Sequence, residues 1–203
     1  MSENIFLPIP YFYEKNLEKI YGDGKFVFVC DCIDIFHPYI PDWIIRRVLE
    51  WIGRCNRAMF LLLTKNPRRF FDFKDEIPVN VCLGVTVESN INYKYGSSPP
   101  QDERLKVFAD LANDVQLFQY ARLISVEPVM GFDLDSFYWN IRFCLPDCVV
   151  IGYDNHNSKL VEPYEKDVLK LIGMLEKAGI IVIRKTIREK WDFTGQKGLG
   201  EYV

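Results

Sequence analysis

The stretch AMFLLLTKNP at residues 58–67 decides the fold of this chain, because it contains one complete strand-to-helix transition. Its first six residues are apolar and of strand length, Thr64 and Lys65 are polar, and Pro67 suits the first turn of a helix. The same order recurs along the chain. We therefore predict repeating units in which a buried strand is followed by a polar loop and a helix.

Six apolar runs of strand length follow this pattern. They lie at residues 26–32, 58–63, 81–87, 122–126, 148–151 and 180–183. Runs that are apolar on both faces are typical of parallel sheets, whose faces helices must cover. We predict an α/β fold, a partial (β/α) TIM-like barrel of about six parallel strands. A doubly wound open sheet is the alternative, because periodicity does not separate the two.

Helical patterns separate these runs. We predict helices at residues 14–21, from 41 to about 52, in a short turn after 67, at 102–113 and at 163–178, where Gly179 ends the last one. Residues 133–146 carry only a weak pattern. We expect a single domain, with a lead segment at 1–25, a barrel-like core at 26–190 and an irregular tail at 191–203.

The composition is that of a globular protein, with 49% hydrophobic and 15% aromatic residues. The net charge of -3 disfavours a protein that coats nucleic acid or binds an anionic membrane. No uncharged apolar run approaches the roughly 20 residues that span a bilayer, and residues 1–25 lack a signal-peptide pattern. We therefore expect a cytoplasmic protein without membrane contact.

The six cysteines are scattered, several of them inside apolar runs. We expect free thiols that pack as small hydrophobic side chains. Cys30, Cys32 and His37 lie near one another in sequence, but they do not complete a zinc ligand set, so we predict no metal site. The chain also lacks the GxGxxG, Walker, HExxH and GxSxG motifs, which argues against nucleotide-phosphate sites and serine hydrolases.

Polar and charged residues follow almost every predicted strand. The carboxyl ends of parallel strands lie on one rim, where such folds bind ligands, so we predict a small-molecule site there. The candidate ligand-binding residues are Asp34, His37, Lys65, Glu88, Ser125, Glu127, Asp154, Arg184 and Lys185. Carboxylates and cations on one rim can exchange protons or hold a polar substrate, and the pattern assigns no catalytic residue among them.

Five sequence blocks around these strand ends occur in a familiar order. They are DIFHP at 34–38, LTKNPRR at 63–69, LGVTVE at 83–88, ISVEPVMG at 124–131 and VIG at 150–152. Together they resemble a phage-associated, largely uncharacterised family of radical-SAM-like proteins with a three-cysteine motif. The resemblance extends from about Phe26 to Lys185.

The resemblance implies a barrel fold, S-adenosylmethionine as cofactor, and an iron–sulfur cluster on three cysteines near the N-terminus. This sequence lacks the family's cysteine segment and has no CxxxCxxC arrangement, so we do not expect a cluster from this chain alone. The family's Gly-Gly-Glu after the fifth strand reads Gly152-Tyr153-Asp154 here. The lysine of the family's last strand aligns with either Arg184 or Lys185.

Three functions remain open at this stage. The first is a radical-SAM-like barrel protein of unknown substrate that lacks its own cluster. The second is a cluster-free relative that binds a ligand or a partner, and the third is a phage-type protein that processes nucleic acid with carboxylate-bound metal. A barrel without the family's first strand has an open edge, so either the lead segment covers this edge, or self-association or a second chain completes the barrel.

Overall fold

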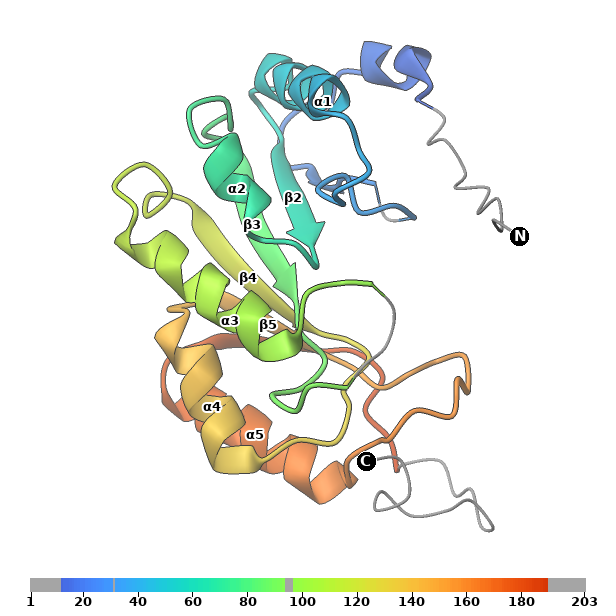
Figure 1. Ribbon diagram of the computed structural model, residues 1–203, viewed down its shortest axis with the longest axis vertical. Coiled ribbons are helices and arrows are strands. Elements are labelled where there is room, and N and C mark those ends of the chain that lie inside the picture. Colours follow the sequence, from blue (N-terminus) through green and yellow to red (C-terminus); the bar gives the residue numbers. More distant parts are fainter. Residues whose placement is uncertain (1–11, 31, 94–96, 190–203) are drawn as a thin grey trace, which may run out of the picture.

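The computed structural model describes residues 12–30, 32–93 and 97–189, which form one curled sheet with helices along one side (Figure 1). The strands are β1 (Phe26–Phe28), β2 (Met59–Thr64), β3 (Val81–Thr86), β4 (Ala121–Val126), β5 (Cys148–Ile151) and β6 (Ile181–Arg184). All neighbouring strands are parallel, and their order in the sheet is their order along the chain. This order lacks the reversal of a doubly wound sheet, so the predicted partial barrel is confirmed.

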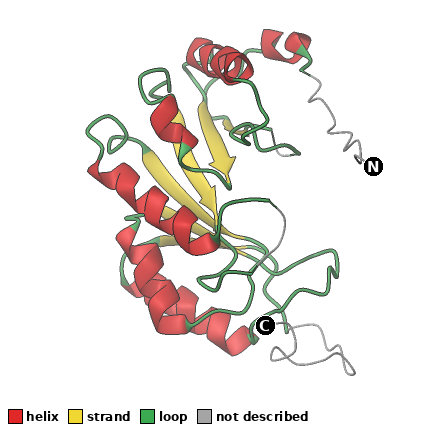
Figure 2. Ribbon diagram, viewed as in Figure 1, coloured by secondary structure: helices red, strands yellow, loops and turns green. Residues whose placement is uncertain are grey.

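Helices cover the convex side of this half-barrel (Figure 2). They are η1 (Glu14–Glu18), α1 (Asp42–Arg54), α2 (Arg69–Asp72), α3 (Gln101–Asp110), η2 (Leu111–Asn113), α4 (Leu134–Phe143) and α5 (Glu165–Lys177). Because connections between parallel strands have one hand, successive crossovers place their helices on the same face. In the part of the chain that is described, no helix is long and apolar enough to cross a membrane.

The main core lies between the helices and the convex face of the sheet. Helix α1 buries Ile45, Leu49 and Ile52, which fall on one side of a helix at spacings of four and three. From β2, Phe60 and Leu62 point into the same core and are fully buried. Alternating side chains point the other way, so each strand contributes to two different environments.

We call the other side of the sheet the concave face. By strand alternation its apolar part consists of Phe26, Phe28, Met59, Leu61, Leu63, Cys82, Gly84, Ala121, Leu123, Cys148, Val150, Ile181 and Ile183, and Thr86 and Ser125 continue it to the carboxyl ends of β3 and β4. Leu61, Cys82 and Leu123 form a small buried cluster at its centre. Toward the edges β1 and β6 the same face is exposed.

Three predicted elements differ from the structure. Strand β1 ends at Phe28 and not at residue 32, and Cys30 adopts a left-handed backbone with φ of 56°. The weakly patterned segment 133–146 contains helix α4, whose first turn is capped by Asp133 accepting from the Ser136 backbone N–H at 3.0 Å. Within the predicted helix 14–21 the structure has only the short 3-10 helix η1.

Other predictions agree or lie outside the described residues. Helix α5 ends before Gly179, whose φ of 81° suits glycine, as predicted. Cys55, Cys82 and Cys144 are buried free thiols, and Cys148 is a free, half-buried one. The first eleven residues of the lead segment and the tail at 191–203 lie outside the described residues.

Candidate functional site

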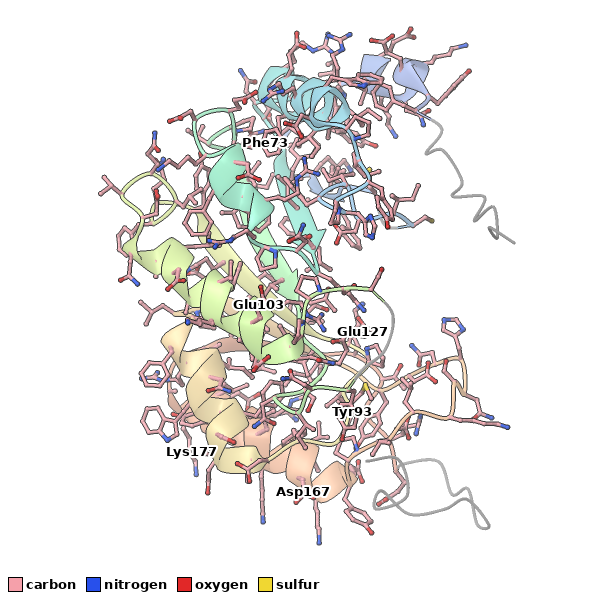
Figure 3. All side chains as sticks on the ribbon, in the orientation of Figure 1. Phe73, Tyr93, Glu103, Glu127, Asp167 and Lys177 are labelled. Atoms are coloured by element: carbon pink, nitrogen blue, oxygen red, sulfur yellow. The ribbon has the colours of Figure 1, made fainter. Side chains whose placement is uncertain are left out.

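The carboxyl ends of the six strands form one rim, which we call the carboxyl rim. Figure 3 shows Glu127 at this end of the sheet. Four of the predicted residues form ion pairs there: Lys65 follows β2, Glu88 follows β3, Glu127 follows β4, and Lys185 follows β6. The rim therefore carries two lysines and two glutamates on strands that neighbour one another, with only β5 between the last two.

Glu88 is the most deeply buried carboxylate of the rim. Its carboxylate contacts Lys65 Nζ at 2.5 Å and Arg104 Nη2 at 2.9 Å. Burial alone raises the pKa of Glu88, but the charges of Arg104 and Lys65 outweigh it and hold that pKa below its ordinary value. Glu88 is therefore ionised at neutral pH and anchors the Lys65 ammonium, whose side chain is 43% exposed.

Arg104 is a site residue that the sequence reading missed. It belongs to α3, is buried, and donates from Nη1 to the Thr86 carbonyl at 2.6 Å as well as to Glu88. Among the described residues its Nε has no hydrogen-bond partner. The missed signal is its spacing: Arg104 lies beside Leu105 and four residues before Phe108 on the buried stripe of the helix, where a charge needs a partner.

Glu127 and Lys185 form the second, more accessible pair. Lys185 Nζ lies 2.6 Å from Glu127 Oε2, and the two side chains are 52% and 24% exposed. Gly152 lies directly beneath them, because a Cβ there would lie 2.9 Å from Lys185 Cβ and 3.3 Å from Glu127 Oε1. The absence of a side chain at Gly152 allows the pair to close over the end of β5.

Arg184 and Lys185, the two candidates for the basic residue of the last strand, lie on opposite sides of the sheet. Val150 pairs with Ile183 in the sheet, so Ile183 and Lys185 lie on the concave side and Arg184 on the other. Arg184 accordingly contacts Glu176 of α5 at 2.8 Å. The Arg184 guanidinium is thus directed toward the helix layer, and the structure does not bring it together with Glu127 and Lys185.

Asp34 holds the end of β2, from which Lys65 reaches the rim. Its Oδ2 accepts hydrogen bonds from Thr64 Oγ1 at 2.9 Å and from the Lys65 backbone N–H at 2.8 Å, while Oδ1 accepts from the Phe36 N–H at 2.9 Å. These bonds join the loop after β1 to the end of β2. Asp34 thus fixes the backbone from which the Lys65 side chain extends.

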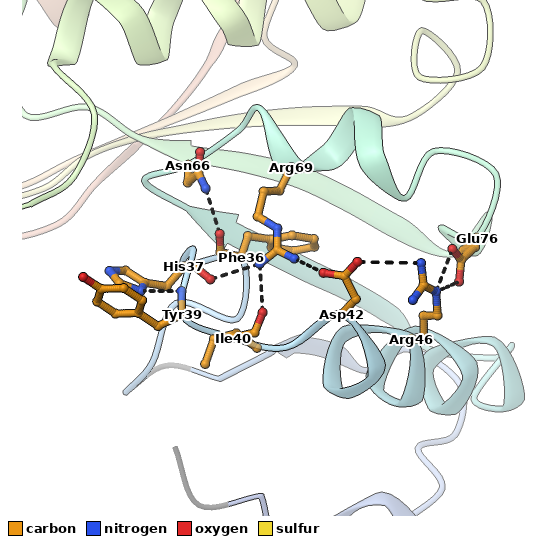
Figure 4. A network of polar contacts seen from close by, with 9 residues as sticks. All are labelled: Phe36, His37, Tyr39, Ile40, Asp42, Arg46, Asn66, Arg69 and Glu76. Carbon is orange, nitrogen blue, oxygen red and sulfur yellow. Dashed lines mark hydrogen bonds and ion pairs between the residues drawn. The ribbon is translucent and has the colours of Figure 1, made fainter. Parts of the chain in front are cut away.

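His37 lies on the loop between β1 and α1, which Figure 4 shows in detail. Arg69 Nη1 donates to the carbonyls of His37 and Ile40, both at 3.0 Å, and its other terminal nitrogen contacts Asp42. The His37 Nδ1 accepts from the Tyr39 backbone N–H at 3.3 Å. Through Arg69 the short helix α2 therefore holds this loop in place.

The remaining two predicted residues are buried. Ser125 is paired with Thr86 across β4 and β3, and both hydroxyls lie on the concave side just below the ion pairs. The Asp154 carboxylate accepts from the backbone N–H groups of His156 at 3.0 Å and Ser158 at 2.5 Å. Burial acts to raise the pKa of Asp154, but these hydrogen bonds lower it overall, so the ionised carboxylate shapes its own loop.

The thiols of this chain do not fit an iron–sulfur cluster. Burial raises the pKa of Cys82 and of Cys144 to about 12, so both are protonated thiols at neutral pH. Cys30 and Cys32 are exposed after β1, but two thiolates are fewer than such a cluster needs. Among residues 12–30, 32–93 and 97–189, no three His, Cys, Asp or Glu side chains converge on a metal position.

Comparison with known proteins gives one match. Residues 11–152 match the family described as a protein of unknown function (DUF5131). The matched range includes β1 to β5 and ends at Gly152, so it contains Lys65, Glu88 and Glu127. No curated protein and no solved structure matches the chain.

Proposed function

The chain belongs to this DUF5131 family, and we propose that it binds a small zwitterionic molecule at its carboxyl rim. The resemblance to radical-SAM-like proteins makes S-adenosylmethionine the first candidate, since its methionyl end carries one ammonium and one carboxylate. In this proposal the chain is a radical-SAM-like half-barrel of unknown substrate that has no iron–sulfur cluster of its own.

The observation that carries the proposal is the accessible pair of Glu127 and Lys185. A zwitterion offers the same two charges in the opposite arrangement, so its ammonium can bind Glu127 while its carboxylate binds Lys185. Hydrogen bonds between charged partners are about twice as strong as neutral ones. The hydroxyls of Thr86 and Ser125 lie just below and offer further donors to the ligand.

The neighbouring charges act as support for this site. Glu88 is held by Arg104 from the helix layer, and it binds the Lys65 ammonium with its other oxygen. A second cation thus remains on the rim at a fixed place, where it raises the affinity of the rim for an anionic group. In this proposal the contacts of Glu88 stay in place when the ligand binds, whereas the contact between Glu127 and Lys185 is replaced by contacts with the ligand.

A purely structural role explains the Glu127–Lys185 pair less well. Ion pairs this exposed contribute about 1 kcal/mol or less to folding. The rim supports a metal-dependent nuclease less well, because the cations beside Glu88 and Glu127 compete with a divalent metal for the same oxygens.

Calorimetric titration of the whole chain with S-adenosylmethionine tests the proposal. We expect saturable binding of one molecule per chain, and a loss of about tenfold or more in affinity in Lys185→Met, since a hydrogen bond to a charged group contributes about 1.5–3 kcal/mol. The matched control is Arg184→Met, one residue away and paired with α5, which should bind within about twofold of the parent chain. Absence of binding, or equal losses in both variants, would refute the proposed site.

A further inference from the structure

The concave face is apolar and remains open at both margins. Phe26, Phe28 and Met59 are 60%, 45% and 41% exposed at the β1 side, and Ile181 and Ile183 are 65% and 48% exposed at the β6 side. None of the strand residues of the concave face carries a charge, and Glu127 and Lys185, which lie beyond the strands at the carboxyl rim, pair with each other. In a closed barrel this surface would be the packed interior.

The two margins are also open sheet edges. Within the described chain, β1 pairs only with β2, and β6 pairs only with β5. Natural proteins protect such edges with lysine, proline or inward-pointing charges. Here the side chains that face inward from both edges are phenylalanine and isoleucine, which leave the edges suited to contact with another apolar surface.

The exposed apolar area fits one protein partner. Five large side chains that are each about half exposed present on the order of 400–650 Å² of apolar surface, taking about 150–250 Å² for a large side chain. A standard interface buries about 800 Å² per partner, of which a little over half is apolar. The concave face therefore supplies about the apolar area that one side of a stable interface requires.

We propose that a second copy of this chain covers the concave face. Two-fold symmetry brings the β1 margin of one copy against the β6 margin of the other, and each contact occurs twice. The uncharged face matches itself without unpaired charges, which favours a second copy over a partner of opposite charge. The concave face continues upward into Thr86, Ser125 and Glu127, so the second copy also encloses the side of the rim that is open in one chain.

Sedimentation equilibrium of the whole chain from about 1 to 200 μM tests this interface. We expect the mass of two chains, and a dissociation constant raised about 30-fold or more in Phe28→Ser and in Ile183→Ser, as for truncation of a central interface residue. The matched control is Phe143→Ser, which removes an equally apolar, 68% exposed side chain from the outer surface of α4 and should leave the mass unchanged.

A second measurement needs no substitution. Hydrogen exchange of the parent chain at low and high concentration should slow at the backbone amides of β1 and β6 as the dimer forms, and stay constant in α4. A single-chain mass at every concentration would overturn the proposal. So would a dimer that Phe143→Ser dissociates while Phe28→Ser and Ile183→Ser leave it intact. A single-chain mass at every concentration, together with binding of S-adenosylmethionine, would reject this interface and leave the proposed ligand site standing.

Discussion

The two faces of the sheet are built from the same strands and yet have opposite characters. On β2, Phe60 and Leu62 are fully buried against the helices, whereas Met59 on the concave face is 41% exposed. The helix-covered face is a complete core, and the concave face is the interior of a barrel that the described residues do not close. Stability is therefore expected to depend on the convex side, and recognition on the concave side and its rim.

The largest expected effect lies where the helix layer reaches the rim, at Arg104. Arg104→Met should lower the free energy of unfolding by about 3–5 kcal/mol, because it leaves the buried Glu88 carboxylate without its main partner. Urea denaturation measures the change. Arg46→Met, which removes an exposed pair with Glu76, is the control and should cost less than about 1 kcal/mol. Equal costs would mean that Glu88 is not buried as described.

A smaller effect compares the two faces directly. Leu62→Ala should destabilise the chain by about 2–5 kcal/mol, since it opens a cavity in the complete core. Ile183→Ala, on the exposed margin, should cost less than about 1 kcal/mol in the single-chain species at low concentration, since little burial is lost. If both variants lose the same amount in urea denaturation, the distinction between the faces fails.

The change of the unfolding free energy at acid pH tests the role of the Glu88 carboxylate without a substitution. The folded-state pKa of Glu88 is below its ordinary value, so the ionised group stabilises the fold at pH above about 4.5, and this contribution is lost as the pH falls through the folded-state pKa. Unfolding free energies measured from pH 7 to pH 3 should therefore decline at the acid end. Glu88→Gln should be less stable at pH 7 and should show a shallower decline.

The smallest expected effect is that of Lys185→Met on folding. Its pair with Glu127 is half exposed, so the free energy of unfolding should change by less than about 1 kcal/mol although ligand affinity falls. Thermal and urea denaturation of the ligand-free variant measure this. A loss of several kcal/mol would assign the pair to the stability of the fold.

Most of the fold was predictable from sequence because the strands are recognisable as apolar runs followed by polar residues. Helix α4 was missed for a physical reason. It buries Phe137 and Ile141, but Trp139 and Phe143 are large apolar residues on its exposed side, so no polar face marks the periodicity. Strand β1 was predicted too long, because the apolar run does not reveal the left-handed backbone at Cys30.

The positions of the candidate site residues at one rim were predictable as a set, but their individual contacts were not. The strand-end rule located Lys65, Glu88, Glu127 and Lys185, all of which form ion pairs at the rim. It could not distinguish Arg184 from Lys185, since that choice depends on the register between β5 and β6. The strand-end rule could not identify Arg104, because this residue belongs to helix α3 and reaches the rim only through tertiary packing.

Mapping ligand binding onto the backbone by NMR tests most directly whether the carboxyl rim is the ligand site. Amide chemical shifts of the isotope-labelled chain are recorded during a titration with S-adenosylmethionine. We expect the shifts to concentrate at the carboxyl ends of β2 to β6, around Lys65, Glu88, Glu127, Gly152 and Lys185. Shifts confined to the outer surfaces of α1, α4 and α5, or no shifts at saturating ligand, would contradict it.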